Sequence, residues 1–266
     1  NYAWNENLTA AAFRYFKKLC PDAVFVTGGG NISVEGWEES YNPSEKDKPL
    51  VRFSKKQDME VFRIMPEVDF LVHGFGEYPF ANIVEKLLGA RSNASLKGMK
   101  IDGCTGFHDG EIITGKPIPT ILNLDEYPSP YINGLFSEML EKYHLPPQVE
   151  CTRGCPYQCA FCTEAGYSKL AKHSFEYIKE EILYLKDNAP NKLLRITDSN
   201  WGIFEQDLKI AEFLHKLIKD TGYPVGIRVF YTTRGTTGRV KKIAKLMKNY
   251  LPLNLSFQTL TPSVLE

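Results

Sequence analysis

Apolar residues in the first third of the chain follow two different spacings. Over residues 8–20 they form one helical stripe, and Pro21 ends that predicted helix. Short apolar, β-rich runs follow at 23–27 and 68–72, each leading into glycines, and residues 78–88 have the pattern of an amphipathic helix. Strands, glycine turns and helices in this order predict parallel α/β structure.

Polar and irregular segments separate these elements. Residues 31–60 are expected to be an insertion loop. Residues 90–130 are rich in Gly, Pro, Asn and Asp and predict a small hairpin and a linker, which a helix at 132–143 follows. We therefore expect a Rossmann-like domain over residues 1–90 and a linker over residues 91–146.

Strands and helices alternate from residue 147 onwards. The predicted strands are 148–152, 193–197, 224–231 and 253–258, and the helices between them are 174–187, 205–220 and 238–249. Such β/α units in a row are typical of a (β/α) barrel, in which chemistry takes place at the carboxyl ends of the strands. Residues 147–266 are expected to form a partial barrel. Because the chain starts without methionine and stops as a helix begins, we expect further sequence on both sides, including residues beyond Glu266.

Composition narrows the class of protein. The 266 residues are 43% hydrophobic with a formal net charge of +0, which is typical of a globular protein and argues against nucleic acid as the main partner. No apolar run approaches the ~20 residues of a membrane-spanning helix, and no secretory signal is recognisable. Four of the six cysteines crowd into residues 151–162, which favours metal binding and a reducing cytoplasm over disulfides.

The chemistry of the chain is indicated by Cys155, Cys159 and Cys162, with Phe161 before the last cysteine. A zinc site needs four ligands in a tetrahedron, and a ferredoxin cluster needs four thiolates. Three thiolates on a 4Fe–4S cluster leave one iron open, and the amino and carboxylate groups of S-adenosylmethionine (SAM) can chelate that iron. The alternative is a zinc site with Cys151 as fourth ligand, although Cys151 is expected on the preceding strand.

The run ArgGlyCysProTyrGlnCysAlaPheCys (153–162) resembles the radical SAM superfamily. With the two glycine turns upstream, the chain resembles the subgroup that carries an N-terminal cobalamin-binding domain. This resemblance implies a 4Fe–4S cluster that cleaves SAM to a 5′-deoxyadenosyl radical, bound cobalamin, and most often methyl transfer to an unactivated carbon. Some relatives keep the domain without using cobalamin.

Polar residues at the ends of the later strands are candidates for binding the amino-acid and ribose groups of SAM. Asp198 and Asn200 follow one strand, Arg228 lies on the next, and Ser256 and Gln258 belong to the inward row of the last. Ordinary roles in turns and helix caps are an equal alternative for Asp198 and Asn200. The resemblance adds Phe161 to the cofactor-binding candidates.

The glycine turns of the first domain border the nucleotide tail of cobalamin in the related subgroup. Carried over to this chain, the resemblance assigns contacts with cobalamin to Gly28, Gly29, Gly74, Gly76 and Glu77. His73 lies beside the second turn, and this position favours a local structural role over ligation of cobalt.

Two other functions remain open at this stage. A related enzyme with a vestigial or non-methylating cobalamin domain uses the same radical for cyclisation, rearrangement or oxidation. A non-enzymatic protein holds a structural iron–sulfur or zinc module instead. For an enzyme we expect a small-molecule or peptide substrate and a reductant such as flavodoxin or ferredoxin.

Overall fold

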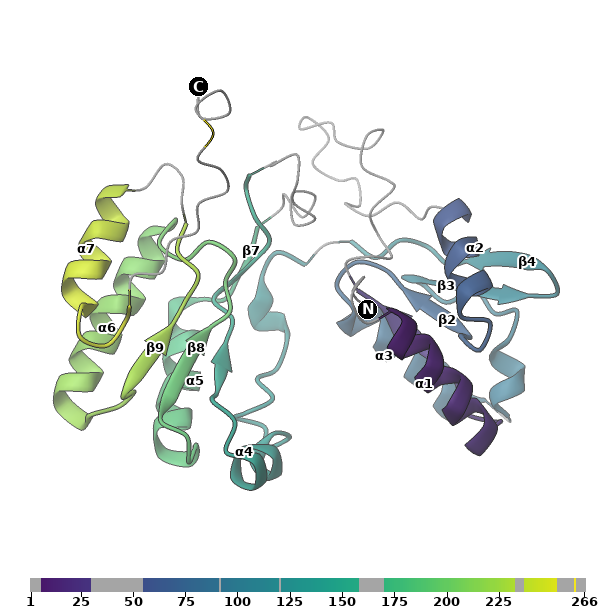
Figure 1. Cartoon of the computed structure of the whole chain (residues 1–266), viewed down its shortest axis with the longest axis horizontal. Coiled ribbons are helices and arrows are strands. Elements are labelled where there is room, and N and C mark those ends of the chain that lie inside the picture. Colours follow the sequence, from purple (N-terminus) through teal and green to yellow (C-terminus); the bar gives the residue numbers. More distant parts are fainter. Residues whose placement is uncertain are drawn as a thin grey trace. The chain divides into compact units, whose positions relative to one another are not determined.

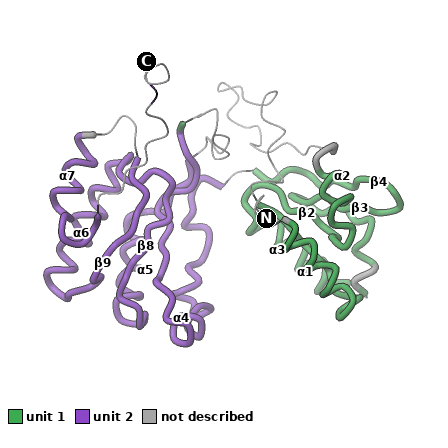
Figure 2. The backbone as a smooth tube through the Cα atoms, in the orientation of Figure 1, with its two compact units in different colours: residues 1–120, 157–167 green, residues 121–156, 168–266 purple. Residues whose placement is uncertain are grey.

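The computed structural model describes residues 6–29, 55–90, 92–119, 121–157, 170–232, 237–252 and 261. The chain divides into two compact units, residues 1–120 with 157–167 and residues 121–156 with 168–266 (Figure 2). Both units combine helices with a sheet that contains parallel strands (Figure 1). The predicted α/β fold class is therefore confirmed.

The first unit contains a four-stranded sheet in the order β1 (Val26–Gly28), β2 (Phe70–Val72), β3 (Cys104–His108) and β4 (Glu111–Thr114). Strands β1 and β2 are parallel, whereas β3 and β4 form an antiparallel hairpin beside β2. The helices are α1 (Glu6–Leu19), α2 (Lys55–Ile64) and α3 (Glu77–Gly89), and a short 3-10 helix spans Asn93–Leu96.

Helices cover both faces of this sheet. Leu71 packs in one cluster with Ala10 of α1 and Phe62 of α2. Its neighbours in β2, Phe70 and Val72, belong to a second cluster that contains a residue of α3. Because successive residues of a strand point to opposite faces, a strand buried on both faces has a continuous apolar sequence. This explains the apolar sequence of β2, Phe70–Val72.

Two expectations for the first unit need correction. Residues 55–60 were expected in a loop but belong to α2, because Phe62 and the residues around it have helical spacing and pack into the core. The predicted hairpin is present at 104–114, but its first strand pairs with β2, so the first sheet extends into the range expected to be linker. Residues 31–54 lie outside the described part of the chain. The division into the ranges 1–90, 91–146 and 147–266 stays a prediction.

The second unit contains a parallel sheet in the order β5 (Gln148–Val149), β8 (Leu193–Ile196) and β9 (Gly226–Arg228). The main helices are α5 (Phe175–Asn188), α6 (Glu205–Thr221) and α7 (Thr237–Met247), preceded by a 3-10 helix at Leu124–Glu126 and by α4 (Ser137–Tyr143). The predicted alternation of parallel strands and helices is confirmed here. The last predicted strand, 253–258, lies outside the described residues.

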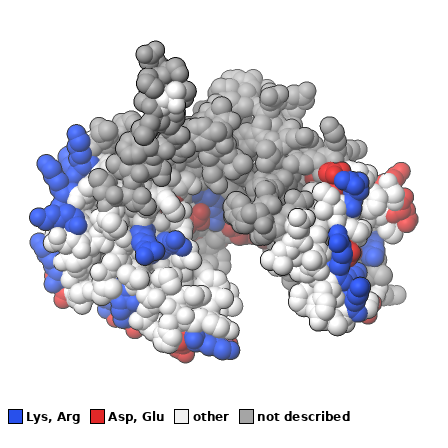
Figure 3. Space-filling view, viewed as in Figure 1, with Lys and Arg blue, Asp and Glu red and all other residues white. Residues whose placement is uncertain are grey.

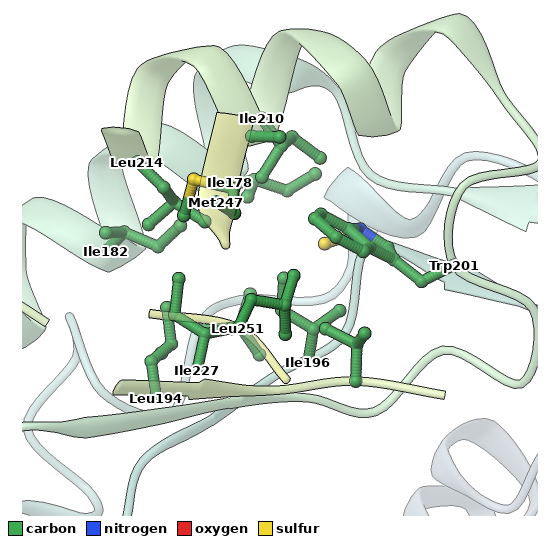
Figure 4. Close-up of a cluster of buried hydrophobic side chains, with 14 of the residues drawn as sticks. Ile178, Ile182, Leu194, Ile196, Trp201, Ile210, Leu214, Ile227, Met247 and Leu251 are labelled. Carbon is green, nitrogen blue, oxygen red and sulfur yellow. The ribbon is translucent and has the colours of Figure 1, made fainter. Parts of the chain in front are cut away.

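One face of the second sheet forms the core of this unit (Figure 4). Side chains of β8 and β9 meet side chains of the three main helices there; the central ones are Leu194, Ile196, Ile227, Ile178, Ile182, Ile210, Leu214 and Met247. The alternate positions of the same strands carry Arg195 and Arg228, which are less buried. The sheet therefore has one apolar face against its helices and one polar face.

Among the described helices, none combines the length and the apolar composition that crossing a membrane requires.

Candidate functional site

The loop that contains the three cysteines begins and ends at a short pair of strands. Strand β6 (Thr152–Arg153) pairs antiparallel with β7 (Ala171–Lys172), so the two ends of the loop are held together. Just outside this pair, the backbone N–H of His173 donates to the carbonyl of Cys151 at 3.1 Å. The pairing fixes the base of the loop. Cys159, Phe161 and Cys162 lie outside the described residues.

Cys155 is the one cysteine of the triplet in the described part of the chain. It is buried, and the Nδ2 atom of Asn200 donates a hydrogen bond to its Sγ atom at 3.0 Å. Asn200 follows β8, and Cys155 follows β5 and β6; because β5 and β8 are parallel neighbours, both residues lie at the carboxyl edge of the sheet. A hydrogen bond donated to sulfur orients a cysteine that binds a metal.

The side chain of Asp198 binds the backbone at the start of the cysteine loop. Its Oδ1 atom accepts a hydrogen bond from the backbone N–H of Cys151 at 2.7 Å. Burial raises the pKa of the Asp198 carboxyl to about 7, although the hydrogen bonds from the amides of Cys151 and Thr152 act in the opposite direction. These contacts support a structural role for Asp198 in the local turn, which was the alternative to SAM binding in the sequence. A contact of Asp198 with SAM stays a prediction.

Cys151 belongs to the hydrophobic core. Its side chain is fully buried among the residues that join the sheet to its helices. Burial raises the pKa of the Cys151 thiol well above its ordinary value, so the thiol is neutral. A zinc ligand must be a thiolate, and the surroundings of Cys151 therefore argue against the alternative zinc site.

Arg228 lies beside a second arginine on the polar face of the sheet. Residues Arg195 of β8 and Arg228 of β9 are register partners. A cavity of about 310 Å³ opens at these residues; it is lined by Arg195, Ile196, Arg228, Val229, Phe230 and Pro252. Arg195 was not among the predicted site residues, although the alternation of apolar and polar residues over 193–197 places it on the polar side of its strand. The candidates Ser256 and Gln258 lie outside the described residues.

The predicted glycines of the first unit meet at the carboxyl edge of β1 and β2. Gly28 is the register partner of Val72, so the turns that follow the two strands are neighbours. Gly29 has a φ of 115° and Gly74 a φ of 67°, and both values favour glycine over other residues. Gly76 is the N-cap of α3, which begins at Glu77. The structure thus brings the five candidate residues to one edge.

His73 is buried beside this edge. Its Nε2 atom lies 3.3 Å from Oδ2 of Asp58 and 2.9 Å from Oγ1 of Thr105. These contacts connect β2 with α2 and β3, which supports a local structural role for His73. Asp58 was not recognised in the sequence because residues 31–60 were expected to be a loop and α2 was not predicted; the helical spacing around Phe62 was the signal.

Comparison with known proteins identifies the second unit. Residues 149–266 match the model of the Radical SAM superfamily. This part of the chain is similar to radical SAM domains, and the relatives of the whole chain support the resemblance to radical SAM enzymes with a cobalamin-binding domain.

Two curated relatives align with the whole of this chain. The 2-(S-pantetheinyl)-carbapenam-3-carboxylate methyltransferase of Streptantibioticus cattleyicolor is 29% identical over 278 residues, and the cobalamin-dependent radical SAM methyltransferase TokK of Streptomyces tokunonensis is 28% identical. The chain spans 36% of the length of each of these two proteins.

A solved structure shares the fold of the chain. The radical SAM methyltransferase TsrM from Kitasatospora setae, solved with tryptophan and a SAM analogue, aligns with 98% of this chain at a TM-score of 0.61. The sequence identity is 12%, and the match covers 46% of that protein. The similarity therefore supports the α/β architecture of both units.

Proposed function

We propose that this protein is a radical SAM enzyme that binds a 4Fe–4S cluster through Cys155, Cys159 and Cys162 and methylates a carbon of its substrate with the help of cobalamin. The hydrogen bond from Asn200 to Cys155 at the carboxyl edge of a parallel sheet is the observation that carries the proposal. The names of the two relatives that align with the whole chain support methyl transfer as the outcome.

The surroundings of Cys155 fit an iron–sulfur cluster. The thiol is buried, and the amide donor of Asn200 at its sulfur stabilises negative charge there. Side-chain and backbone contacts hold the base of the loop from both sides, through Asp198 and through the pairing of β6 with β7. Ligands that are positioned in advance bind a cluster without a large loss of conformational entropy.

The glycine edge of the first unit fits the nucleotide tail of cobalamin. Gly29 and Gly74 remove side chains where a ligand must approach the backbone. Helix α3 starts at the same edge with Gly76 as its N-cap, and the N-terminus of a helix favours a phosphate. We include Gly28 and Glu77 in this proposed site.

When bound, the cluster supplies the electron that breaks a C–S bond of SAM, and cobalamin supplies the methyl group. The residues of the chain position the ligands of these cofactors. Asn200 orients the thiolate of Cys155, and Asp198 fixes the backbone ahead of it. Asp198 and Asn200 also lie at the strand end where we propose that the amino-acid and ribose groups of SAM bind. We propose Phe161, Ser256 and Gln258 as further residues of the SAM site.

Anaerobic reconstitution with iron and sulfide tests the proposed function. The wild-type protein should bind a 4Fe–4S cluster and release 5′-deoxyadenosine from SAM when dithionite is supplied. Cys155→Ala should lose the cluster and this activity, whereas Cys20→Ala, which replaces an exposed cysteine in the first unit, should retain both. A full cluster in Cys155→Ala would refute the assignment.

The products distinguish methylation from the other radical reactions. Formation of S-adenosylhomocysteine together with 5′-deoxyadenosine indicates methyl transfer, and 5′-deoxyadenosine alone indicates cyclisation, rearrangement or oxidation. Cobalamin absorbance after reconstitution reports on the first unit independently. We also propose a flavodoxin or ferredoxin as the physiological reductant and a small molecule or peptide as the substrate.

A further inference from the structure

Two arginines lie side by side on the polar face of the second sheet. Arg195 and Arg228 are register partners on adjacent parallel strands, which are ~4.8 Å apart. Both side chains are on the face opposite the apolar core, because Leu194, Ile196 and Ile227 occupy the alternate positions and are buried. A basic patch over β8 and β9 is visible in Figure 3.

Neither arginine has a counter-ion among the described residues. In contrast, two other arginines of this unit do have ion pairs: Arg153 pairs with Glu150, and Arg239 pairs with Glu205. Like charges directly opposite each other on neighbouring strands destabilise a sheet. An anion bound between the guanidinium groups of Arg195 and Arg228 would offset the repulsion between the two positive charges.

The cavity beside the arginines combines this charge with an apolar wall. Phe230 and Pro252 line the same cavity of about 310 Å³, and the Phe230 side chain is largely exposed. Phe230 lies two residues beyond Arg228, which is roughly 7 Å along an extended strand. This direction leads towards the carboxyl edge, where Cys155 and Asn200 are.

We propose that Arg195 and Arg228 bind an oxyanion of the substrate, a carboxylate or a phosphate, with the apolar part of the substrate along Phe230. Guanidinium groups bind both anions through paired N–H donors. The anion then lies at least two residues along the strand from the edge where the radical is generated. The reacting carbon is therefore separated from the anion by several bonds. This inference rests on the proposed function, and it assigns Arg228 to the substrate instead of SAM.

Arginine modification tests this site without any turnover. The reconstituted full-length protein is treated with phenylglyoxal in the presence of inorganic phosphate, acetate, SAM or chloride at equal ionic strength, and the modified arginines are identified by mass spectrometry. Phosphate or acetate should protect Arg195 and Arg228 several-fold relative to chloride, and the stronger of the two identifies the preferred anion. Arg14, whose side chain is 57% exposed in the first unit, should react equally in all four conditions.

Two results would overturn the proposal. Protection by SAM alone would assign the arginines to the cofactor, and equal reactivity in all four conditions would show that no anion binds there. Both are readable even if the protein does not cleave SAM, so failure of this inference is distinct from failure of the proposed function.

A pair of double variants completes the test. Arg195→Gln/Arg228→Gln should keep the affinity for SAM within about twofold and lose the stabilisation by phosphate or acetate in thermal unfolding. Lys245→Gln/Lys248→Gln removes the same charge from exposed positions in α7 and in the turn that follows it, and should keep that stabilisation. Loss of SAM binding in the arginine variant alone would contradict the proposal.

Discussion

The carboxyl ends of β1 and β2 carry glycines, whereas the carboxyl ends of β5 and β8 carry polar side chains that contact the loop between them and its cysteine. At the first edge, Gly29 and Gly74 leave backbone exposed to a ligand. At the second edge, Asn200 donates to Cys155 and Asp198 accepts from the amide of Cys151. The first edge is characterised by missing side-chain atoms and is tested by adding them. The second is characterised by contacts and is tested by removing them.

The strongest test of the second edge uses the titration of Asp198. Because the pKa is raised to about 7, the folded protein binds a proton that the unfolded chain releases near pH ~4. The free energy of unfolding should therefore fall as the pH rises from ~4 to about 7, by on the order of 4 kcal/mol, and then level off. Urea unfolding followed by circular dichroism over this range measures the slope.

Asp198→Asn removes the titrating group and retains one carbonyl oxygen as an acceptor for the amide of Cys151. Its unfolding free energy should lose this part of the pH dependence. The same slope in Asp198→Asn and in the wild type would show that burial does not raise the pKa of Asp198.

Asn200 tests the second edge at the sulfur itself. Asn200→Ala removes the donor to Cys155, and residues that orient metal ligands typically account for roughly 10–100-fold in metal affinity or activity. Asn200→Asp should have a larger effect, because it brings a carboxylate next to a thiolate. Iron retained by the reconstituted protein against a chelator measures the affinity, and a redox titration should show a lower reduction potential in both variants.

Asn188→Ala is the matched control for this experiment. Its amide also donates a single hydrogen bond, to the carbonyl of Tyr184 on the exposed surface of α5. Iron retention equal to that of the wild type is expected in Asn188→Ala. If Asn200→Ala behaved in the same way, the hydrogen bond to Cys155 would have no role in holding the cluster.

The periodicity of the sequence predicted most elements that bury one or two faces. The strand at 68–72 and the alternating strands of the second unit were recognisable because burial restricts which residue types can occupy them. Helix α2 was not predicted, because its first residues continue a long polar stretch and its polar contact from Asp58 to His73 joins two separate elements.

The candidate site was predictable where residue type determines the chemistry. Cys155 and Asn200 were both expected at one edge, and they are hydrogen-bonded there. The partner of Asp198 is a backbone amide, which has no signature in sequence. Arg195 was missed because its significance comes from its register partner, Arg228, and register depends on tertiary structure.

The smallest expected effects separate two glycines of the first edge. A Cβ atom at Gly28 would lie 3.0 Å from the carbonyl oxygen of Val72, so Gly28→Ala should destabilise the unit by about 1 kcal/mol. A Cβ atom at Gly76 would lie 3.6 Å from Cγ1 of Val72, an ordinary contact, and its φ of −74° suits any residue. Gly76→Ala should therefore change the free energy of unfolding by no more than about 0.5 kcal/mol.

Cobalamin binding by the same two variants decides what Gly76 is for. The fold gives no steric reason for glycine at this position, and a ligand bound at the start of α3 is one physical reason for the missing side chain. Gly76→Ala should weaken cobalamin binding, measured by absorbance after reconstitution, while its unfolding curve matches the wild type. Gly28→Ala should lose stability whether or not cobalamin is present. If Gly76→Ala bound cobalamin as tightly as the wild type, the proposed contact at the start of α3 would be refuted, and the cofactor would have to be sought at Gly29 and Gly74.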